Sequence, residues 1–340
     1  MKNLIQQLTE ISSPSGREDK IRKCILEIVR PYVDQIYTDP LGNLIALKKG
    51  ISGKKILLDA HMDEIGFMVS HIDEEGFIRV EPVGGHQPIK LPHQRIIFEH
   101  GAIGCFSLES EELSKNLQDY QQVSFDRLFV DVGAISQNDA LSKVRIGEMA
   151  TFFPVFSDLG QRVVSKSMDD RIGCAILIEF IKHCSQPYYD VYLVFAAQEE
   201  VGLVGATTAA YGINPELAIA VDITATGFQD HPKGFKRVPM KLGAGPAIKL
   251  QDRSMIGDHR LNQWLAKQAE ENRIPFQFEV LPFGGTDGGA IQTTRSGVTT
   301  TTLSIPTRYG HSACEMIDIG DAQYTVQLLL SVVKKPFEEK

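Results

Sequence analysis

Apolar positions near the start of the chain recur with the period of an amphipathic helix. Between Ile21 and Pro31 they are spaced so that all lie on one face of a helix. The series is Ile21, Cys24, Ile25, Ile28 and Val29. Ser15 and Glu18 stand three residues apart just before this series, a spacing typical of a capping box. The pattern therefore predicts a helix that begins at this box and ends at Pro31.

Short apolar runs alternate with helical patterns in both terminal parts of the chain. The runs typical of buried strands are residues 54–58, 191–195 and 218–221, and residues 299–305 are rich in β-forming residues as well. Helical patterns begin at Asp169 and extend over residues 259–272. Strands that alternate with helices predict an α/β fold, with a mostly parallel sheet and helices on both of its faces.

The stretch between about Ser70 and Arg162 has a different texture. Its apolar runs are short, β-type and separated by Gly, Pro and Asp, and no long helical pattern occurs among them. We therefore expect a catalytic α/β domain formed by residues 1–69 and 163–340. A small β-rich domain of residues 70–162 would be inserted into it.

Composition and charge narrow the class of partner. The 340 residues include 35 Lys and Arg against 43 Asp and Glu, a net charge of −8. Mild acidity without a basic stretch argues against a nucleic-acid or anionic-membrane partner, and no apolar run reaches the roughly 18–20 residues of a membrane helix. The five cysteines form no CxxC pair, so we expect reduced, mostly buried thiols, Cys314 among them, and a cytoplasmic protein.

Acidic and imidazole side chains follow the predicted strands where these end, and one acid opens a helix. They are His61, Asp63, Asp169, Glu199, Glu200, Asp222 and His311. Ligands gather at the carboxyl ends of the strands in open α/β sheets, so these side chains can converge. Crowded carboxylates repel one another, and two divalent cations would offset their charge. Each residue alone is more typical of a hydrogen-bonding group in a loop; the joint pattern predicts a binuclear metal site.

Five motifs resemble, in order, those of the M42 family of metalloaminopeptidases, which includes glutamyl and tetrahedral aminopeptidases. They lie at residues 60–67, 168–173, 198–206, 285–291 and 308–312, and the resemblance extends from Ser13 to about Asp318. It implies a two-metal α/β domain that uses zinc or cobalt, interrupted by a β-rich dimerisation domain. It also implies a homo-oligomer built from dimers, up to a dodecamer. Asp, Glu and His ligands would suit manganese as well.

The resemblance also implies a role for each residue. Asp169 would bridge the two metal ions; His61 and Glu200 would complete one site, Asp222 and His311 the other. Glu199 would be the general base and Asp63 the partner that orients the imidazole of His61. The departures from the family pattern, Ser165, Ser167 and Gly288, replace neither a ligand nor the base.

The activity expected on these grounds is removal of N-terminal residues from peptide substrates by a metal-activated water. Another metallohydrolase of amide bonds is the nearest alternative, because the same site can cleave other amides. A glycoside hydrolase needs two carboxylates that flank one bond, not a cluster with two histidines. A non-catalytic assembly protein is a further alternative, although its sequence mark, loss of the base or of a ligand, is not seen here. Arg253, Arg295 and Arg308 are candidates for a positive charge in the substrate pocket.

Overall fold

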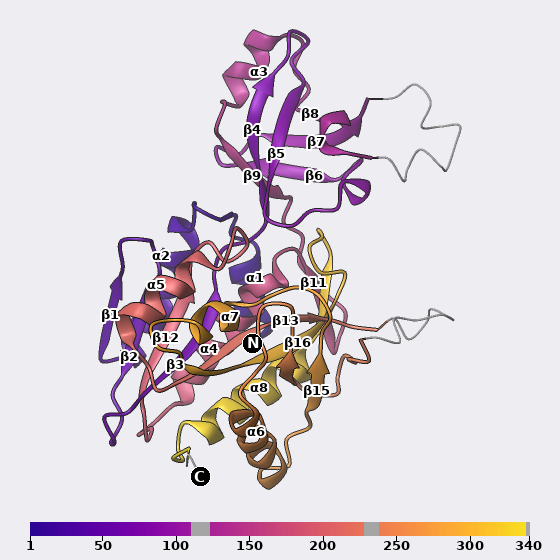
Figure 1. Cartoon of the computed structure of the whole chain (residues 1–340). Coiled ribbons are helices and arrows are strands. Elements are labelled where there is room, and N and C mark those ends of the chain that lie inside the picture. The colour runs from indigo at the N-terminus through magenta and orange to yellow at the C-terminus, as the bar shows by residue number, and fades with distance from the viewer. Residues whose placement is uncertain (110–122, 228–237, 338–340) are drawn as a thin grey trace.

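The computed structural model describes residues 1–109, 123–227 and 238–337. These residues form a larger α/β part and a smaller antiparallel barrel, which stands on one end of the larger part (Figure 1). Among the described residues, no helix is long and apolar enough to cross a membrane.

Four parallel strands form the centre of the large sheet. In spatial order they are β12 (Asp190–Ala196), β3 (Lys55–His61), β13 (Leu217–Ala225) and β16 (Thr299–Arg308). These are the four strands predicted from the sequence, so the expected α/β fold is confirmed. The sheet continues on both sides with mainly antiparallel pairs. The outer strands are β1 (Gln35–Thr38), β2 (Leu44–Lys48), β10 (Ser157–Asp158), β11 (Arg162–Ser165), β14 (Ala247–Gln251), β15 (Gln277–Val280) and β17 (Glu315–Asp318).

Helices cover both faces of this sheet. On one face α4 (Met168–His183) packs on β3 and β13. The same hydrophobic core includes side chains of α1 (Lys2–Thr9), α2 (Asp19–Val29), α6 (His259–Glu271) and α8 (Ile319–Val332). On the other face lie α5 (Val204–Ile213) and α7 (Asp287–Gln292), which share a core with Leu57 of β3. Successive side chains of a strand point to opposite faces, and this is why Leu58 of the same strand joins the α4 core.

The smaller part is a closed barrel with its own core. Its strands follow one another in space as β4 (Gly66–Ile72), β5 (Ile78–Val83), β8 (Leu128–Asp131), β7 (Ile103–Leu108), β6 (Arg95–Phe98) and β9 (Met149–Phe152). Short helices accompany them: η2 (Pro88–Lys90), η4 (Phe125–Arg127) and α3 (Gln137–Lys143). The chain enters the barrel after β3 and returns to the large sheet through β10 and β11, so a β-rich insertion is present in the α/β fold.

The helix expected before Pro31 is present, but its predicted capping box is wrong. Helix α2 begins at Asp19, and no side chain caps its N-terminus. The Ser15 hydroxyl instead donates to Asp63 Oδ2 at 2.6 Å, and Glu18 Oε1 accepts the backbone N–H of Gln198 at 3.2 Å. Polar groups at the ends of β3 and β12 thus engage the two side chains that would have capped the helix.

The expectation that the cysteines are mostly buried holds for only some of them. Cys174 and Cys184 are buried, whereas Cys105 and Cys314 are exposed, so the prediction of a buried Cys314 is wrong. Cys314 lies in the short turn between β16 and β17, and this turn lines a cavity.

Candidate metal centre

His61 is the last residue of β3, and its ring lies between two carboxylates. Its Nε2 is 3.1 Å from Asp169 Oδ1, and its Nδ1 is 3.3 Å from Asp63 Oδ1. The imidazole is almost completely buried, with 2% of its side chain exposed. A carboxylate beside Nδ1 favours a proton on that nitrogen, which leaves Nε2 with a lone pair for a metal ion.

Asp169, in the first turn of α4, lies between two imidazoles. Its Oδ1 faces His61 Nε2, and its Oδ2 is 3.1 Å from His311 Nε2. Its backbone N–H donates to Glu315 Oε2 at 3.0 Å, which fixes the main chain at this point. A carboxylate with one oxygen toward each histidine has the geometry of a bridging ligand.

The two glutamates after β12 point to different histidines. Glu199 Oε2 is 3.8 Å from His61 Nε2, and Glu200 Oε2 is 3.6 Å from His311 Nε2. Asp63 holds the backbone of both, because its Oδ1 accepts the N–H of Glu199 at 3.1 Å and its Oδ2 that of Glu200 at 3.2 Å. Asp63 therefore aligns the turn that carries both glutamates, in addition to lying beside His61.

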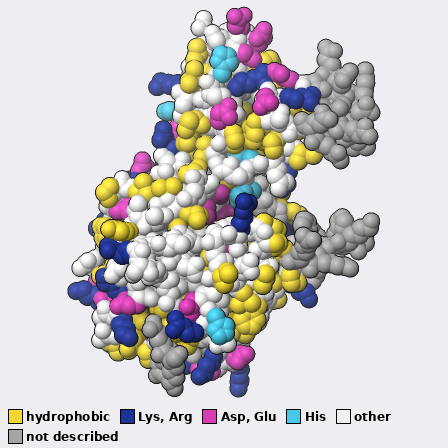
Figure 2. Space-filling model, in the orientation of Figure 1, with side chains coloured by type: hydrophobic (Ala, Val, Ile, Leu, Met, Phe, Trp, Pro, Cys, Tyr) yellow, Lys and Arg dark blue, Asp and Glu magenta, His cyan; other side chains and the backbone are white. Residues whose placement is uncertain are grey.

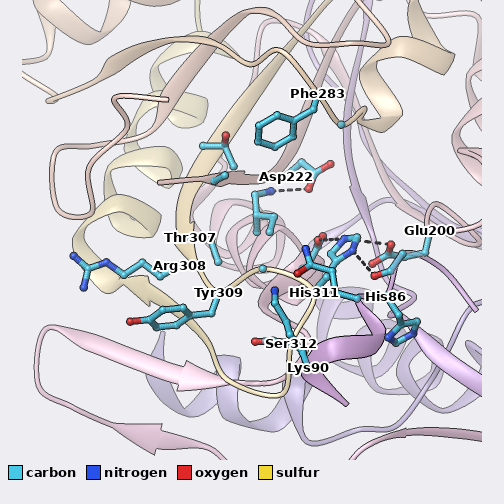
Figure 3. Close-up of a pocket in the computed structure, with 18 of the residues that line it drawn as sticks. His86, Lys90, Glu200, Asp222, Phe283, Thr307, Arg308, Tyr309, His311 and Ser312 are labelled. Atoms are coloured by element: carbon cyan, nitrogen blue, oxygen red, sulfur yellow. Dashed lines mark hydrogen bonds and ion pairs between the residues drawn. The ribbon is translucent and has the colours of Figure 1, made fainter. Parts of the chain in front are cut away.

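Asp222 of β13 and His311, which follows β16, complete the cluster. Donor atoms of His61, Glu199 and Asp222 lie within 4.8 Å of one another, as do those of His61, Asp169 and Glu200. Figure 3 shows Glu200 and His311 pointing toward each other, while Arg308 extends away from them. The structure thus brings together all seven residues that the sequence singled out.

Burial and mutual repulsion shift the ionisation of these groups. Burial, together with the nearby charge of Asp169, raises the pKa of Asp222 to about 7 and the pKa of Glu200 well above its usual range. Burial opposes the charged form of His311, yet the hydrogen bond to Asp169 and the charge of Glu200 raise the pKa of His311 to about 11. The cluster therefore attracts positive charge strongly.

The donor set fits divalent cations. Oε1 of Glu200 is buried and makes no hydrogen bond within the part of the chain that the structure describes. Such an uncompensated buried oxygen is costly unless a cation or another partner meets it. Carboxylate and imidazole donors, without a thiolate among them, suit zinc, cobalt and manganese.

Sequence reasoning missed three buried acids beside the centre. Glu315, at the start of β17, accepts the backbone N–H groups of both Asp169 and His311, the second at 2.7 Å. A contact to main-chain N–H groups leaves no sequence pattern. Asp59, two positions before His61, shares its strand face by the period of two, and that signal could have revealed it. Burial raises the pKa of Asp59 to about 7 and that of Asp287 well above its usual range.

The centre opens into a cavity of about 1290 Å³ between the barrel and the α/β part. Figure 2 shows the hollow between these parts, with acidic and histidine side chains inside it. Apart from the seven clustered residues, the charged side chains among its described lining are Lys90 of the barrel and Arg308 of β16. Of the three arginines proposed for the pocket, Arg308 lines it, whereas Arg295 stacks on Tyr211 and donates to its carbonyl.

Comparison with known proteins agrees with this geometry. The family model described as M42 glutamyl aminopeptidase matches residues 42–328. The chain belongs to the M42 family. It is accordingly an aminopeptidase, a hydrolase of peptide bonds, and family membership implies divalent metal ions.

Three of the similar proteins illustrate how far the likeness extends along the chain. The lysyl aminopeptidase of Pyrococcus furiosus is 35% identical over 98% of this chain and 96% of its own. The solved aminopeptidase of Desulfurococcus kamchatkensis has a TM-score of 0.92 and 36% identity over 98% of this chain and 94% of its own. The Pyrococcus horikoshii TET1 peptidase is described as assembling into a tetrahedron or a large octahedral shell. It has a TM-score of 0.87 and 33% identity over 98% of this chain and 99% of its own.

Proposed function

We propose that this M42 protein removes N-terminal residues from peptides by means of two divalent metal ions held at the cluster. The observation that carries the proposal is the position of Asp169, whose two oxygens each lie 3.1 Å from a different histidine. Two ions, one beside each histidine, would then share this carboxylate.

The distances favour a different division of the other ligands from the one expected. Glu200 lies beside His311, and Asp222 groups with His61. We therefore propose that His61 and Asp222 hold one ion, that Glu200 and His311 hold the other, and that Asp169 bridges them.

The ions would supply Lewis acidity, which polarises the scissile carbonyl and lowers the pKa of a water. Glu199 has the position of a general base, because its carboxylate lines the cavity beside His61 and belongs to the same donor group as Asp222. It would accept the proton of the attacking water and return it to the leaving amine. Asp63 would keep Glu199 in place through its backbone N–H.

Selectivity for a free N-terminus follows from the charge of the cavity floor. Carboxylates that exceed what the ions neutralise would attract the substrate α-ammonium group. A hydrolase of acylated amino acids would need no such group, and this separates the two amide-cleaving functions experimentally.

Metal identity and assembly are part of the same proposal. We infer zinc or cobalt as the ion, and a homo-oligomer built from dimers, on the strength of the family and of the shells described for the Pyrococcus horikoshii relative. The inserted segment, residues 70–162, would be the dimerisation domain.

Glu199→Gln is the test. The amide keeps the size of the side chain but cannot take up the proton, so kcat should fall by about 100-fold or more while two ions still bind. Glu179→Gln on α4, whose partner is Lys182, is the matched control and should keep full activity. Activity should also vanish after chelation and dialysis, and N-acetylated peptides should not be cleaved. Full activity of Glu199→Gln would remove it from the role of base, and hydrolysis that survives chelation would exclude the metal mechanism.

A further inference from the structure

The barrel touches the metal centre through two adjacent glycines, Gly84 and Gly85, which follow β5. His311 Nδ1 donates to the backbone carbonyl of Gly85 at 2.7 Å. A carbonyl oxygen can only accept, so this contact keeps a proton on Nδ1 and makes Nε2, which faces Asp169 and Glu200, the nitrogen that an ion would bind.

Both glycines lie close to the centre, and a side chain at Gly85 would clash with His311. A Cβ at position 85 would lie 2.8 Å from His311 Nδ1 and 3.0 Å from Cε1. A Cβ at position 84 would lie 3.2 Å from Cβ of Glu200. His311 and Glu200 are the two residues assigned above to one ion, and a single two-residue segment of the barrel packs on both.

The barrel core fixes this segment through the next residue, His86. Its Nε2 donates to the carbonyl of Gly66 at 2.8 Å, and its ring lies 4.3 Å from Phe67 and 5.9 Å from Phe152. Burial in this aromatic layer lowers the pKa of His86 to about 4, so the ring is neutral and packs as part of the core. The position of the Gly85 carbonyl is therefore set by the barrel, not by the α/β part.

We propose that Gly85 is a positioning residue for His311, and that through it the barrel completes one of the two metal sites. The inference rests on the two-ion function proposed above. A barrel that moves relative to the α/β part would withdraw the carbonyl from His311 and weaken that ion alone. By linkage, binding of that ion would hold the barrel in place.

Gly85→Ala tests the contact cleanly, because the backbone at Gly85, unlike that at Gly84, lies outside the left-handed region that disfavours alanine. Zinc uptake is measured by equilibrium dialysis with elemental analysis. The added methyl group should push the imidazole of His311 away from the carbonyl. The variant should then bind one Zn²⁺ as the wild type does and the second about 10- to 100-fold more weakly, the usual effect of losing an outer partner of a metal ligand. Gly212→Ala is the matched control, because a Cβ there meets nothing within 4 Å.

The same substitution in a His311→Ala background isolates the cause. Without the imidazole, Gly85→Ala should leave the affinity for the remaining ion unchanged. It should also shift the unfolding midpoint of the ion-free chain by no more than Gly212→Ala does. If Gly85→Ala alone fails to fold, the double variant should fold.

Three results would overturn the inference: unchanged binding of both ions by Gly85→Ala, an effect that persists without His311, or misfolding of the double variant. Wild-type protein that binds fewer than two zinc ions would overturn the proposed function itself. The wild-type stoichiometry therefore distinguishes the two failures.

Discussion

Asp63 makes polar contacts with several groups around the metal centre. Its carboxylate lies beside His61, accepts the N–H groups of Glu199 and Glu200, and accepts the hydroxyl of Ser15. Burial opposes its charge, but the hydrogen bonds from His61, Ser15 and the backbone hold the pKa of Asp63 below its usual range. One acid thus sets the orientation of a proposed ligand, His61, and of the proposed base, Glu199.

Ser15→Ala should weaken this arrangement without touching a ligand. A hydrogen bond to a charged group contributes about 1.5–3 kcal/mol, so we expect kcat to fall by roughly tenfold or more. Ser15→Thr keeps the hydroxyl and should recover part of the loss. Ser142→Ala, whose hydroxyl donates to the Asp139 carbonyl on α3, is the control. Steady-state kinetics would contradict the role of Ser15 if both alanine variants matched the wild type.

The clustering of the proposed ligands could be predicted from sequence because their residue types recur at strand ends and in recognisable motifs. The contacts of Glu315 and Ser15 could not be predicted. Their hydrogen-bond partners are a backbone N–H and a side chain from distant segments. The spacing of Ser15 and Glu18 even favoured a local cap, which tertiary contacts override in the folded chain.

At the scale of elements, a buried ionic cluster joins the start of α4 to the end of β3 and the N-terminal segment. Lys166 Nζ lies 2.6 Å and 2.8 Å from the oxygens of Glu64, and both side chains are at most 3% exposed. Arg171 adds hydrogen bonds to the carbonyls of Leu8 and Ser13. Asp169 lies between the two cations in sequence, so this cluster anchors the proposed bridging ligand.

Lys166→Met should therefore destabilise the whole protein. Removal of one partner from a buried ion pair costs about 3–5 kcal/mol, because the other charge remains buried. Urea unfolding should show this loss, whereas Lys182→Met, a partly exposed pair with Glu179, should stay within about 1 kcal/mol of wild type. A loss of similar size in both variants would contradict the structural role of the cluster.

The central strands were predictable because each is a β-type run buried on both faces, apolar in β3, β12 and β13 and rich in threonine in β16. The antiparallel outer strands were not, because β1, β10, β11 and β17 are short and their pairing depends on which neighbour the folded sheet offers. Of the helices that cover the sheet, α2, α4 and α6 followed from their period, whereas α5, α8 and the six-residue α7 were not predicted.

At the scale of the whole molecule, the α/β part, the barrel and the proposed ions form one linked system. The change in apolar texture near Ser70 and Arg162 predicted an insertion, but nothing in it revealed that Gly85 meets His311. That contact depends on how two separately packed cores dock, and the pattern of polar and apolar residues does not indicate how they dock.

Metal loading should release protons. In the ion-free centre the pKa values of Asp222, Glu200 and His311 are raised, so at neutral pH these groups hold protons that an incoming ion must displace. Apparent metal affinity should therefore increase as pH rises through about 7 and fall on acidification. Titration calorimetry of the apo-protein with Zn²⁺, in buffers of different ionisation enthalpy, measures the number released. Heats that do not depend on the buffer would contradict this protonation.

The proposed ligands are spread along the chain from His61 to His311, and this spacing governs when activity can arise during synthesis. A chain leaving the ribosome has the barrel and most of the sheet before the last histidine is added. Any product that stops earlier lacks one imidazole of the pair around Asp169. The peptidase would thus stay inert beside other nascent chains until His311 has been synthesised.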